Sequence, residues 1–225
     1  MATARDEGNG NIESLRQKGT PFLLGVTGGV ATGKTVVAEM FEELGAPTVD
    51  FDLLSRLVVE RGQQAWKEIV DYFGKRVLRE DGTLDRRKLA MIVFQDEEKR
   101  KKLESFVHPR VGEEFLKLVA QYAADDTNTI VQAVVPLLFE VNMQSTFDKV
   151  LLVYAPEETQ IERLMKRDGI SRDMAAIVLA SQLPIENKRD QADFIVDNSG
   201  SLEQTRAQVE QIWGDLKRVQ QKRTS

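Results

Sequence analysis

Three segments of the chain are apolar almost without interruption. They run from Phe22 to Thr27, from Thr129 to Leu138 and from Lys149 to Tyr154, and each is rich in Val, Leu or Ile. This composition is typical of strands that are buried on both faces of a parallel sheet. Two shorter segments, Pro47 to Asp50 and Phe194 to Asp197, each end at an aspartate and are predicted as further strands.

Between the strands, apolar residues recur at the spacing of amphipathic helices. The predicted helices are Val36 to Leu44, Gln63 to Phe73, Arg86 to Phe94, Glu97 to Tyr122, Glu157 to Arg167 and Leu202 to Arg218. Strands and helices that alternate in this way predict an α/β fold, with a parallel five-stranded sheet flanked by helices.

The predicted strands are unevenly spaced, and the gaps suggest a domain organisation. About residues 52–126 the pattern is helical, with a turn at Arg79 to Leu84, which predicts an inserted helical domain for a substrate. The sheet core would then consist of residues 21–51 and 127–225. A charged segment at about residues 160–192, between the last two predicted strands, resembles a mobile lid.

Composition limits the possible partners. The 225 residues suffice for one core with an inserted subdomain. Their net charge of −5 argues against nucleic acid as the main partner, because such ligands require a basic face. The absence of cysteine excludes disulfides, thiolate zinc sites and a cysteine nucleophile, and it fits a reducing cytoplasm. We therefore expect a cytoplasmic monomer.

The chain shows no membrane or secretion signal. No segment approaches the roughly 20 apolar residues that cross a bilayer. Residues 1–20 are polar and lack the apolar centre of a secretory signal. We expect them to form a mobile leader, with a short helix around Ile12 to Gln17.

The sequence GGVATGKT lies between the first predicted strand and a helix. In this setting the glycines let backbone N–H groups surround phosphate oxygens, the lysine reaches the transferable phosphates and the threonine hydroxyl binds Mg²⁺. The dinucleotide fingerprint requires no Lys-Thr at its end, so a nucleoside triphosphate such as ATP is the expected ligand of the core. The candidate ATP-binding residues are Gly28, Gly29, Val30, Ala31, Thr32, Gly33, Lys34 and Thr35, with Thr35 also the candidate metal ligand.

Two fragments resemble GTPase motifs but stand in the wrong context. Asp71 to Gly74 fits D-x-x-G, yet it ends an amphipathic helix where a switch sensor should follow a buried strand. Asn187 to Asp190 fits N-K-x-D, yet it precedes a strand that the guanine-binding motif should follow. A GTPase is therefore not the favoured interpretation.

A motor ATPase is not favoured either, because the strand in IVQAVVPLLFE has no acidic pair at its end. Another acid must then assist the metal and the nucleophile. Asp50 and Asp52 are the candidates, because they lie where the second strand ends, at the edge where the phosphate loop opens. Asp52 is the candidate base for an acceptor hydroxyl, whereas Asp50 is also compatible with a helix cap or turn.

Arginines in the expected lid could neutralise a transferring phosphoryl group. Arg163 and Arg167 are four residues apart on one helical face, and Arg172 follows a glycine-containing turn. The same pattern is typical of a solvated helix. The sequence does not choose among the three arginines.

Several motifs in this order resemble the dephospho-coenzyme A kinase family over about residues 21–215. The resemblance rests on GVTGGVATGKT, VDFDLLSRLVV, DGTLDRRKLAMIVF, FVHPRV, VVPLLFE and the segment from RLMKRDGISR to ADFIVDNSGS. It implies a P-loop kinase that transfers the γ-phosphate of ATP to the ribose 3′-hydroxyl of dephospho-coenzyme A, the last step of coenzyme A biosynthesis.

The motif positions imply individual roles. Asp52 would be the catalytic base, Lys34 would hold ATP and Arg163 would be the lid arginine, with Arg167 a further candidate ATP contact. Asn198 and Gly200 would lie beside the adenine. The implied acceptor-side residues are Thr27, Asp52, Arg56, His108, Pro136, Leu137, Leu138 and Glu140.

Some points stay open. His108, the only histidine, is either an acceptor contact or a packing residue at a break between helices before Pro109, and we do not propose it as the base. The loop departs from the family at Ala31-Thr32, where many members have Gly-Ser. A kinase for another nucleoside or nucleotide, and a non-catalytic nucleotide-binding regulator, remain alternatives.

Overall fold

The computed structural model describes residues 20–224, which form two compact units. A helical unit comprises Phe51–Leu118, and a sheet unit contains residues 20–50 and 119–224. Apart from Thr20, the predicted leader and its helix lie outside the described residues. No helix within residues 20–224 is both long and apolar enough to cross a membrane.

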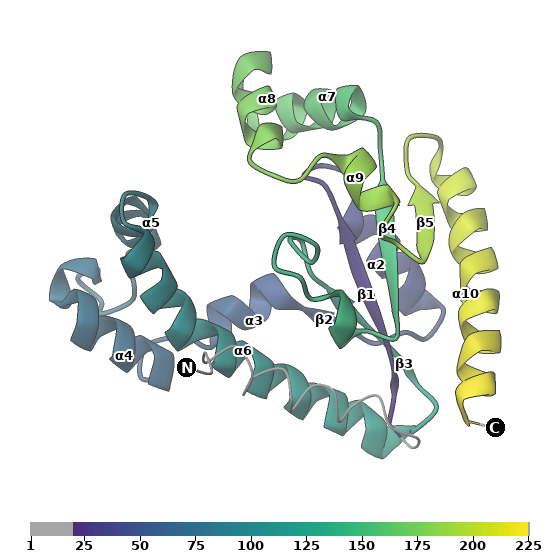
Figure 1. Cartoon of the computed structure of the whole chain (residues 1–225), viewed down its shortest axis with the longest axis horizontal. Coiled ribbons are helices and arrows are strands. Elements are labelled where there is room, and N and C mark those ends of the chain that lie inside the picture. Colours follow the sequence, from purple (N-terminus) through teal and green to yellow (C-terminus); the bar gives the residue numbers. More distant parts are fainter. Residues whose placement is uncertain (1–19, 225) are drawn as a thin grey trace. The chain divides into compact units, whose positions relative to one another are not determined.

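The sheet unit is built on five parallel strands in the order β2-β3-β1-β4-β5 (Figure 1). The strands are β1 (Phe22–Gly28), β2 (Thr48–Asp50), β3 (Ile130–Val134), β4 (Lys149–Tyr154) and β5 (Phe194–Asp197). β1 is central and fully buried, with Val26 in register with Val134 on one side and Leu151 on the other. The predicted fold class is confirmed.

One predicted strand is too long. The apolar run to Leu138 was expected to stay extended, but β3 ends at Val134. Pro136 lacks the N–H that would continue the ladder. Beyond it the chain turns back, with the N–H groups of Val141 and Met143 donating to the carbonyls of Leu137 and Leu138.

Two helices pack beside the central strands (Figure 1). α2 (Lys34–Glu43) and α10 (Leu202–Thr224) share a core with β1, β3, β4 and β5. The α10 residues in that core are Val209, Ile212, Trp213 and Leu216. Their spacing of three to four residues gives α10 the apolar stripe that lets a helix pack on a sheet.

The end of α10 is tied to the start of the sheet by a partly buried ion pair. Arg223 Nη1 lies 2.7 Å from Asp148 Oδ2 and also donates to the carbonyl of Pro21. The same carboxylate oxygen accepts from the Leu23 N–H at 2.8 Å. α10 continues past the predicted end at Arg218, and these contacts stabilise its last turns.

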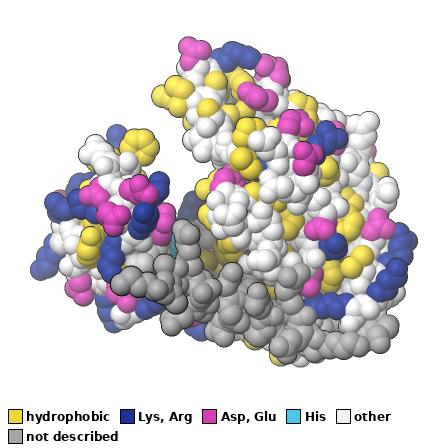
Figure 2. All heavy atoms as spheres, in the orientation of Figure 1, with side chains coloured by type: hydrophobic (Ala, Val, Ile, Leu, Met, Phe, Trp, Pro, Cys, Tyr) yellow, Lys and Arg dark blue, Asp and Glu magenta, His cyan; other side chains and the backbone are white. Residues whose placement is uncertain are grey.

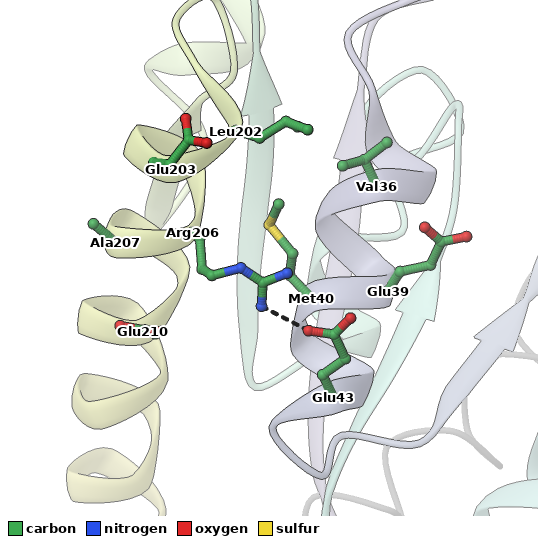
Figure 3. A pocket seen from close by; sticks show the side chains of 9 residues that line it. All are labelled: Val36, Glu39, Met40, Glu43, Leu202, Glu203, Arg206, Ala207 and Glu210. Carbon is green, nitrogen blue, oxygen red and sulfur yellow. Dashed lines mark hydrogen bonds and ion pairs between the residues drawn. The ribbon is translucent and has the colours of Figure 1, made fainter.

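The surface between α2 and α10 holds a groove of about 480 Å³ (Figure 3). Its lining residues are Val36, Glu39, Met40, Glu43, Leu202, Glu203, Arg206, Ala207 and Glu210. Arg206 bridges the groove with an ion pair of 2.6 Å to Glu43. None of the predicted site residues lines this groove.

The helical unit contains α3 (Phe51–Leu57), α4 (Gln64–Phe73), the 3₁₀ turn η2 (Lys75–Val77), α5 (Arg86–Phe94) and most of α6 (Glu97–Asp125). Its interior includes Ile69, Phe73, Val77 and Phe115, each at most 3% exposed. The predicted turn is confirmed, because the backbone N–H of Arg79 donates to the Thr83 carbonyl, and Leu78 and Leu84 form an antiparallel β-bridge.

The expected break before Pro109 is wrong, because α6 continues through this proline. Proline removes one helical hydrogen bond and frees the carbonyl four residues earlier. That residue is Ser105, and both Ser105 and Pro109 lie on the exposed side of α6. The freed carbonyl is therefore on the hydrated side, where the helix tolerates the loss.

Candidate active site

The phosphate loop joins β1 to α2, and its glycines are required by close contacts. Gly33 has φ 91°, and a Cβ there would lie 2.2 Å from Asn198 Nδ2. A Cβ on Gly28 would lie 2.5 Å from the carbonyl oxygen of Val153. A side chain at Gly28 would displace the backbone of β4, and at Gly33 both the positive φ and the Asn198 amide disfavour a side chain, so both positions require glycine.

Ala31 adopts a left-handed backbone with φ 58°, which is uncommon outside glycine. This is the position where many members of the resembled family have glycine. Val30 and Ala31 pack against a small core formed by Ile161, Leu164 and Ala175. The methyl group of Ala31 thus gains apolar contacts that offset its backbone strain.

Lys34 curls over the loop at the start of α2. Its ammonium donates to the carbonyls of Gly29 at 2.8 Å and Gly28 at 3.2 Å, which keeps the charge beside the loop. Thr32 is buried and donates to the Gly29 carbonyl, whereas Thr35 is exposed in the first turn of α2. The Thr35 hydroxyl is therefore accessible to a ligand.

The expected lid region contains α7 (Glu157–Asp168), α8 (Arg172–Ala180) and α9 (Ile185–Arg189). α8 and α9 were not predicted. Figure 2 shows hydrophobic side chains gathered over α8, where Met174 and Ile177 are 50% and 64% exposed. The opposite side of α8 carries Ala175 into the small core under the phosphate loop.

Only one of the three candidate arginines contacts the phosphate loop within residues 20–224. Arg163 donates to the carbonyl of Asn198 at 2.7 Å and reaches that of Thr32 at 3.5 Å. Arg167 is 59% exposed and pairs with its neighbour Asp168, while Arg172 pairs with Glu158. The hydrogen bond from Arg167 is the main cause of the lowered pKa of Asp168.

Asn198 holds the other side of the loop. Its Nδ2 donates to the Thr32 carbonyl at 2.8 Å, and its Oδ1 accepts from the Thr205 hydroxyl at 2.9 Å. At Gly200, a Cβ would lie 2.2 Å from Gln204 Oε1. Asn198 therefore fixes the start of the segment after β5 against the phosphate loop.

Two glutamines at the site were missed by sequence reasoning. Gln182, in the turn after α8, accepts a 2.9 Å hydrogen bond from the Val30 N–H. Gln160 is buried beneath the loop, where its Oε1 would lie 2.2 Å from a Cβ on Gly29, and it donates to the Ala155 carbonyl. No local signal marks either residue, because both act through tertiary contacts.

The predicted acceptor residues in the sheet unit are mostly engaged in internal contacts. Thr27 is fully buried and donates to the Pro136 carbonyl at 3.3 Å, and Leu138 is fully buried. Leu137 is 43% exposed and accessible.

Glu140 forms an ion pair of 2.6 Å with Lys188, whose side chain is fully buried. The same Oε1 accepts from the Leu183 N–H at 3.1 Å. Glu140 thus fixes α9 and the turn that precedes it. Lys188 belongs to the N-K-x-D fragment, which lies in α9 rather than after a strand and so lacks the context of a guanine-binding motif.

The helical unit contains the remaining candidates. Asp52 and Arg56 are exposed on α3, which begins directly after β2 ends at Asp50. His108 is exposed on α6, so the interpretation of this histidine as a buried packing residue is wrong. Asp71, of the D-x-x-G fragment, lies in the last turn of α4.

A phosphate loop on the central strand of a five-stranded parallel sheet, held by an arginine-bearing helix, defines the class of P-loop kinases for small molecules. Residues 22–204 match the family model described as dephospho-CoA kinase. The chain belongs to the dephospho-CoA kinase family.

Individual relatives agree with this assignment. A dephospho-CoA kinase from Halalkalibacterium halodurans is 47% identical over 188 residues, which cover 84% of this chain and 93% of that protein. A crystal structure from Thermus thermophilus is similar with a TM-score of 0.74 and 32% identity, covering 88% of this chain and 98% of that one. The dephospho-CoA kinase from Campylobacter jejuni gives a TM-score of 0.66 and 28% identity over the same shares.

Proposed function

We propose that this enzyme transfers the γ-phosphoryl group of ATP to the ribose 3′-hydroxyl of dephospho-coenzyme A, giving ADP and coenzyme A. The observation that carries the proposal is a complete phosphate loop in a chain of the dephospho-CoA kinase family, with Lys34 and Arg163 both contacting that loop. The sheet unit would bind the donor, and the helical unit would bind the acceptor.

The donor-side roles follow from the contacts. Backbone N–H groups from Ala31 to Thr35 surround the phosphates at the N-terminus of α2. The Lys34 ammonium, released from its loop carbonyls, neutralises the transferring group. Arg163 supplies a second positive charge. Its hydrogen bonds to the carbonyls of Asn198 and Thr32 also join the segment after β5 to the phosphate loop.

The acceptor-side role belongs to Asp52. An alcohol is a weak nucleophile until a base accepts its proton, and a carboxylate suits that task. In the transfer, the 3′-oxygen forms a bond to the γ-phosphorus and the bond from that phosphorus to the β,γ-bridging oxygen breaks. The hydroxyl proton passes to the Asp52 carboxylate, and ADP leaves with the electron pair of the broken bond.

The residues present fit Mg²⁺. Kinases typically hold this ion with few protein ligands, using substrate phosphates and water for the others. The exposed Thr35 hydroxyl at the start of α2 is such a ligand. Within residues 20–224 no group of three or more His, Cys, Asp or Glu could hold a metal alone. When bound with ATP, Mg²⁺ neutralises phosphate charge.

The direct test is a mass measurement with purified protein, ATP and Mg²⁺. Dephospho-coenzyme A should gain one phosphate, while pantetheine, adenosine and nucleoside monophosphates should not be efficient acceptors. Lys34→Ala should lower turnover by about 10² or more, because it removes the phosphate-binding ammonium. Efficient phosphorylation of a nucleoside monophosphate instead would establish the alternative kinase, and ATP binding without any product would establish the regulator.

The expected monomeric state and cytoplasmic location belong to the same proposal. The acidic net charge of −5 and the absence of cysteine support them. Light scattering coupled to size-exclusion chromatography should give a mass near 25.4 kDa.

A further inference from the structure

Gln182 lies in the turn between α8 and α9, and only one end of its side-chain amide has a partner within residues 20–224. Its Oε1 accepts a hydrogen bond of 2.9 Å from the Val30 N–H of the phosphate loop. Because an N–H can bond only to the oxygen of a carboxamide, this contact also fixes the position of Nε2. No described group accepts a hydrogen bond from Nε2, and this nitrogen is not buried. A ligand can therefore reach it.

The peptide group between Gly29 and Val30 is also the one on which the Lys34 ammonium rests. Its carbonyl oxygen accepts from Lys34 Nζ at 2.8 Å and from the Thr32 hydroxyl at 3.0 Å, while its N–H donates to Gln182. The lysine of a phosphate loop reaches the β- and γ-phosphates of the nucleotide. Gln182 therefore meets the loop at the end that serves the terminal phosphates.

The backbone that carries Gln182 is held on both sides. The Gln182 N–H donates to the Leu179 carbonyl at 3.0 Å, and the next N–H, of Leu183, donates to Glu140 Oε1 at 3.1 Å. Glu140 is itself fixed by its ion pair with the buried Lys188. A side chain on a fixed turn loses less conformational freedom when it binds a ligand, so the amide is preorganised.

Two side chains of α7 also lie against the loop, and they contribute differently. Gln160 is 3% exposed, and its Nε2 donates to the Ala155 carbonyl at 2.8 Å, so a ligand cannot reach it. Arg163 contacts the loop at the Thr32 carbonyl. Gln182 thus adds a neutral donor at Val30 to the positive charge that Arg163 brings to Thr32.

On the basis of the proposed function, we propose that Gln182 binds the γ-phosphate of ATP. Its Nε2 donates to a terminal phosphate oxygen while its Oε1 keeps the Val30 N–H. ADP lacks this oxygen, so the contact distinguishes ATP from ADP. Transfer of the phosphoryl group to the acceptor removes the contact, which favours release of ADP.

The test compares the affinities for the β,γ-imido analogue of ATP and for ADP, measured by calorimetric titration with Mg²⁺ and without acceptor. Gln182→Leu should weaken binding of the analogue about tenfold, because a hydrogen bond to a charged group is lost. The affinity for ADP should change less than threefold. Gln182→Glu still accepts from the Val30 N–H but presents a negative oxygen in place of the donor. It should weaken binding of the analogue at least as much as Gln182→Leu does.

Gln191→Leu is the matched control. Gln191 is an exposed glutamine after α9 whose amide bonds to the Asn187 carbonyl and to Gln144. Its replacement should leave both affinities unchanged. Melting temperatures check that each variant is folded, and Gln182→Glu carries the test by itself if Gln182→Leu does not fold.

Two results would show that Gln182 only links the turn after α8 to the loop, and either would overturn the proposal. One is an equal loss for the analogue and ADP in Gln182→Leu, and the other is full binding of the analogue by Gln182→Glu. Unchanged affinities in both variants, or an unaltered protein that binds neither nucleotide, would refute it as well. Failure of the proposed function is distinguishable, because these titrations need no acceptor and apply equally to a protein that makes no coenzyme A.

Discussion

The guanidinium group of Arg163 donates a 2.7 Å hydrogen bond to the backbone carbonyl of Asn198. The same group reaches the Thr32 carbonyl, and Asn198 itself donates to that carbonyl at 2.8 Å. α7, the phosphate loop and the segment after β5 therefore meet at one oxygen. Helix α7 is linked to the phosphate loop through backbone carbonyls.

Arg163→Ala should lower kcat by about 10² or more, because it removes both a phosphate-stabilising charge and this link. Arg163→Lys should recover only part of the loss, since an ammonium lacks the fork of donors that spans two carbonyls. Steady-state kinetics measures both effects. Arg167→Ala is the control and should change kcat less than twofold, because Arg167 pairs only with the adjacent Asp168 among the described residues. A loss in Arg167→Ala as large as that in Arg163→Ala would contradict our choice of lid arginine.

Ala31 offers a test of the phosphate-loop backbone. Ala31→Val should weaken ATP binding about tenfold or more, because a β-branched side chain disfavours the left-handed conformation. Ala31→Gly should stay within a few fold of the unaltered protein, since relief of backbone strain offsets the lost packing against Ile161. Calorimetric titration with ATP gives both affinities. Equal affinities of the Val and Gly variants would show that the loop tolerates another conformation.

Asp52→Asn should lower kcat by about 10² or more while the affinity for ATP is retained. The amide keeps the size of the carboxylate but cannot accept the hydroxyl proton at neutral pH. Asp71→Asn, an exposed aspartate at the end of α4, is the matched control and should be active. If Asp52→Asn turns over normally, the base is another group.

The buried pair of Glu140 and Lys188 predicts a large effect on stability. Glu140→Leu leaves the fully buried ammonium uncompensated and should cost about 3 kcal/mol of unfolding free energy. The double variant Glu140→Leu/Lys188→Met should recover much of this loss, because neither charge then remains buried. Lys149→Met breaks a partly exposed ion pair of the same 2.6 Å length and should cost about 1 kcal/mol or less. Urea unfolding measures all three, and additive losses in the double variant would contradict the coupling.

The phosphate loop and the sheet could be predicted because their signals are local. Gly28 to Thr35 specifies its own backbone chemistry, and the buried strands are continuous apolar runs. β3 was predicted too long because the apolar run continues to Leu138, although Pro136 ends the ladder. α8 and α9 were missed because residues 172–189 mix charged and apolar positions, and their faces depend on the neighbouring helices.

The site was less predictable because it depends on tertiary contacts. Arg163 and Arg167 share one helical face, yet only Arg163 contacts the phosphate loop among the described residues, in a helix that is packed through Ile161 and Leu164. The contact of Gln182 with Val30 joins residues far apart in the sequence, and nothing near Gln182 marks it. Lys188 belongs to a fragment that resembles a guanine-binding motif, yet its role is that of a buried counterion to Glu140.

The family match ends at residue 204, shortly after α10 begins, whereas α10 runs to Thr224 and its Trp213 and Leu216 complete the main core. A gene fragment trimmed to residues 22–204 would therefore leave Phe41 and its neighbours facing water, and its product should aggregate on expression. The end of the family match and the end of the folded unit therefore differ in this enzyme. Anyone who excises it for fusion to another protein should retain the whole C-terminal tail.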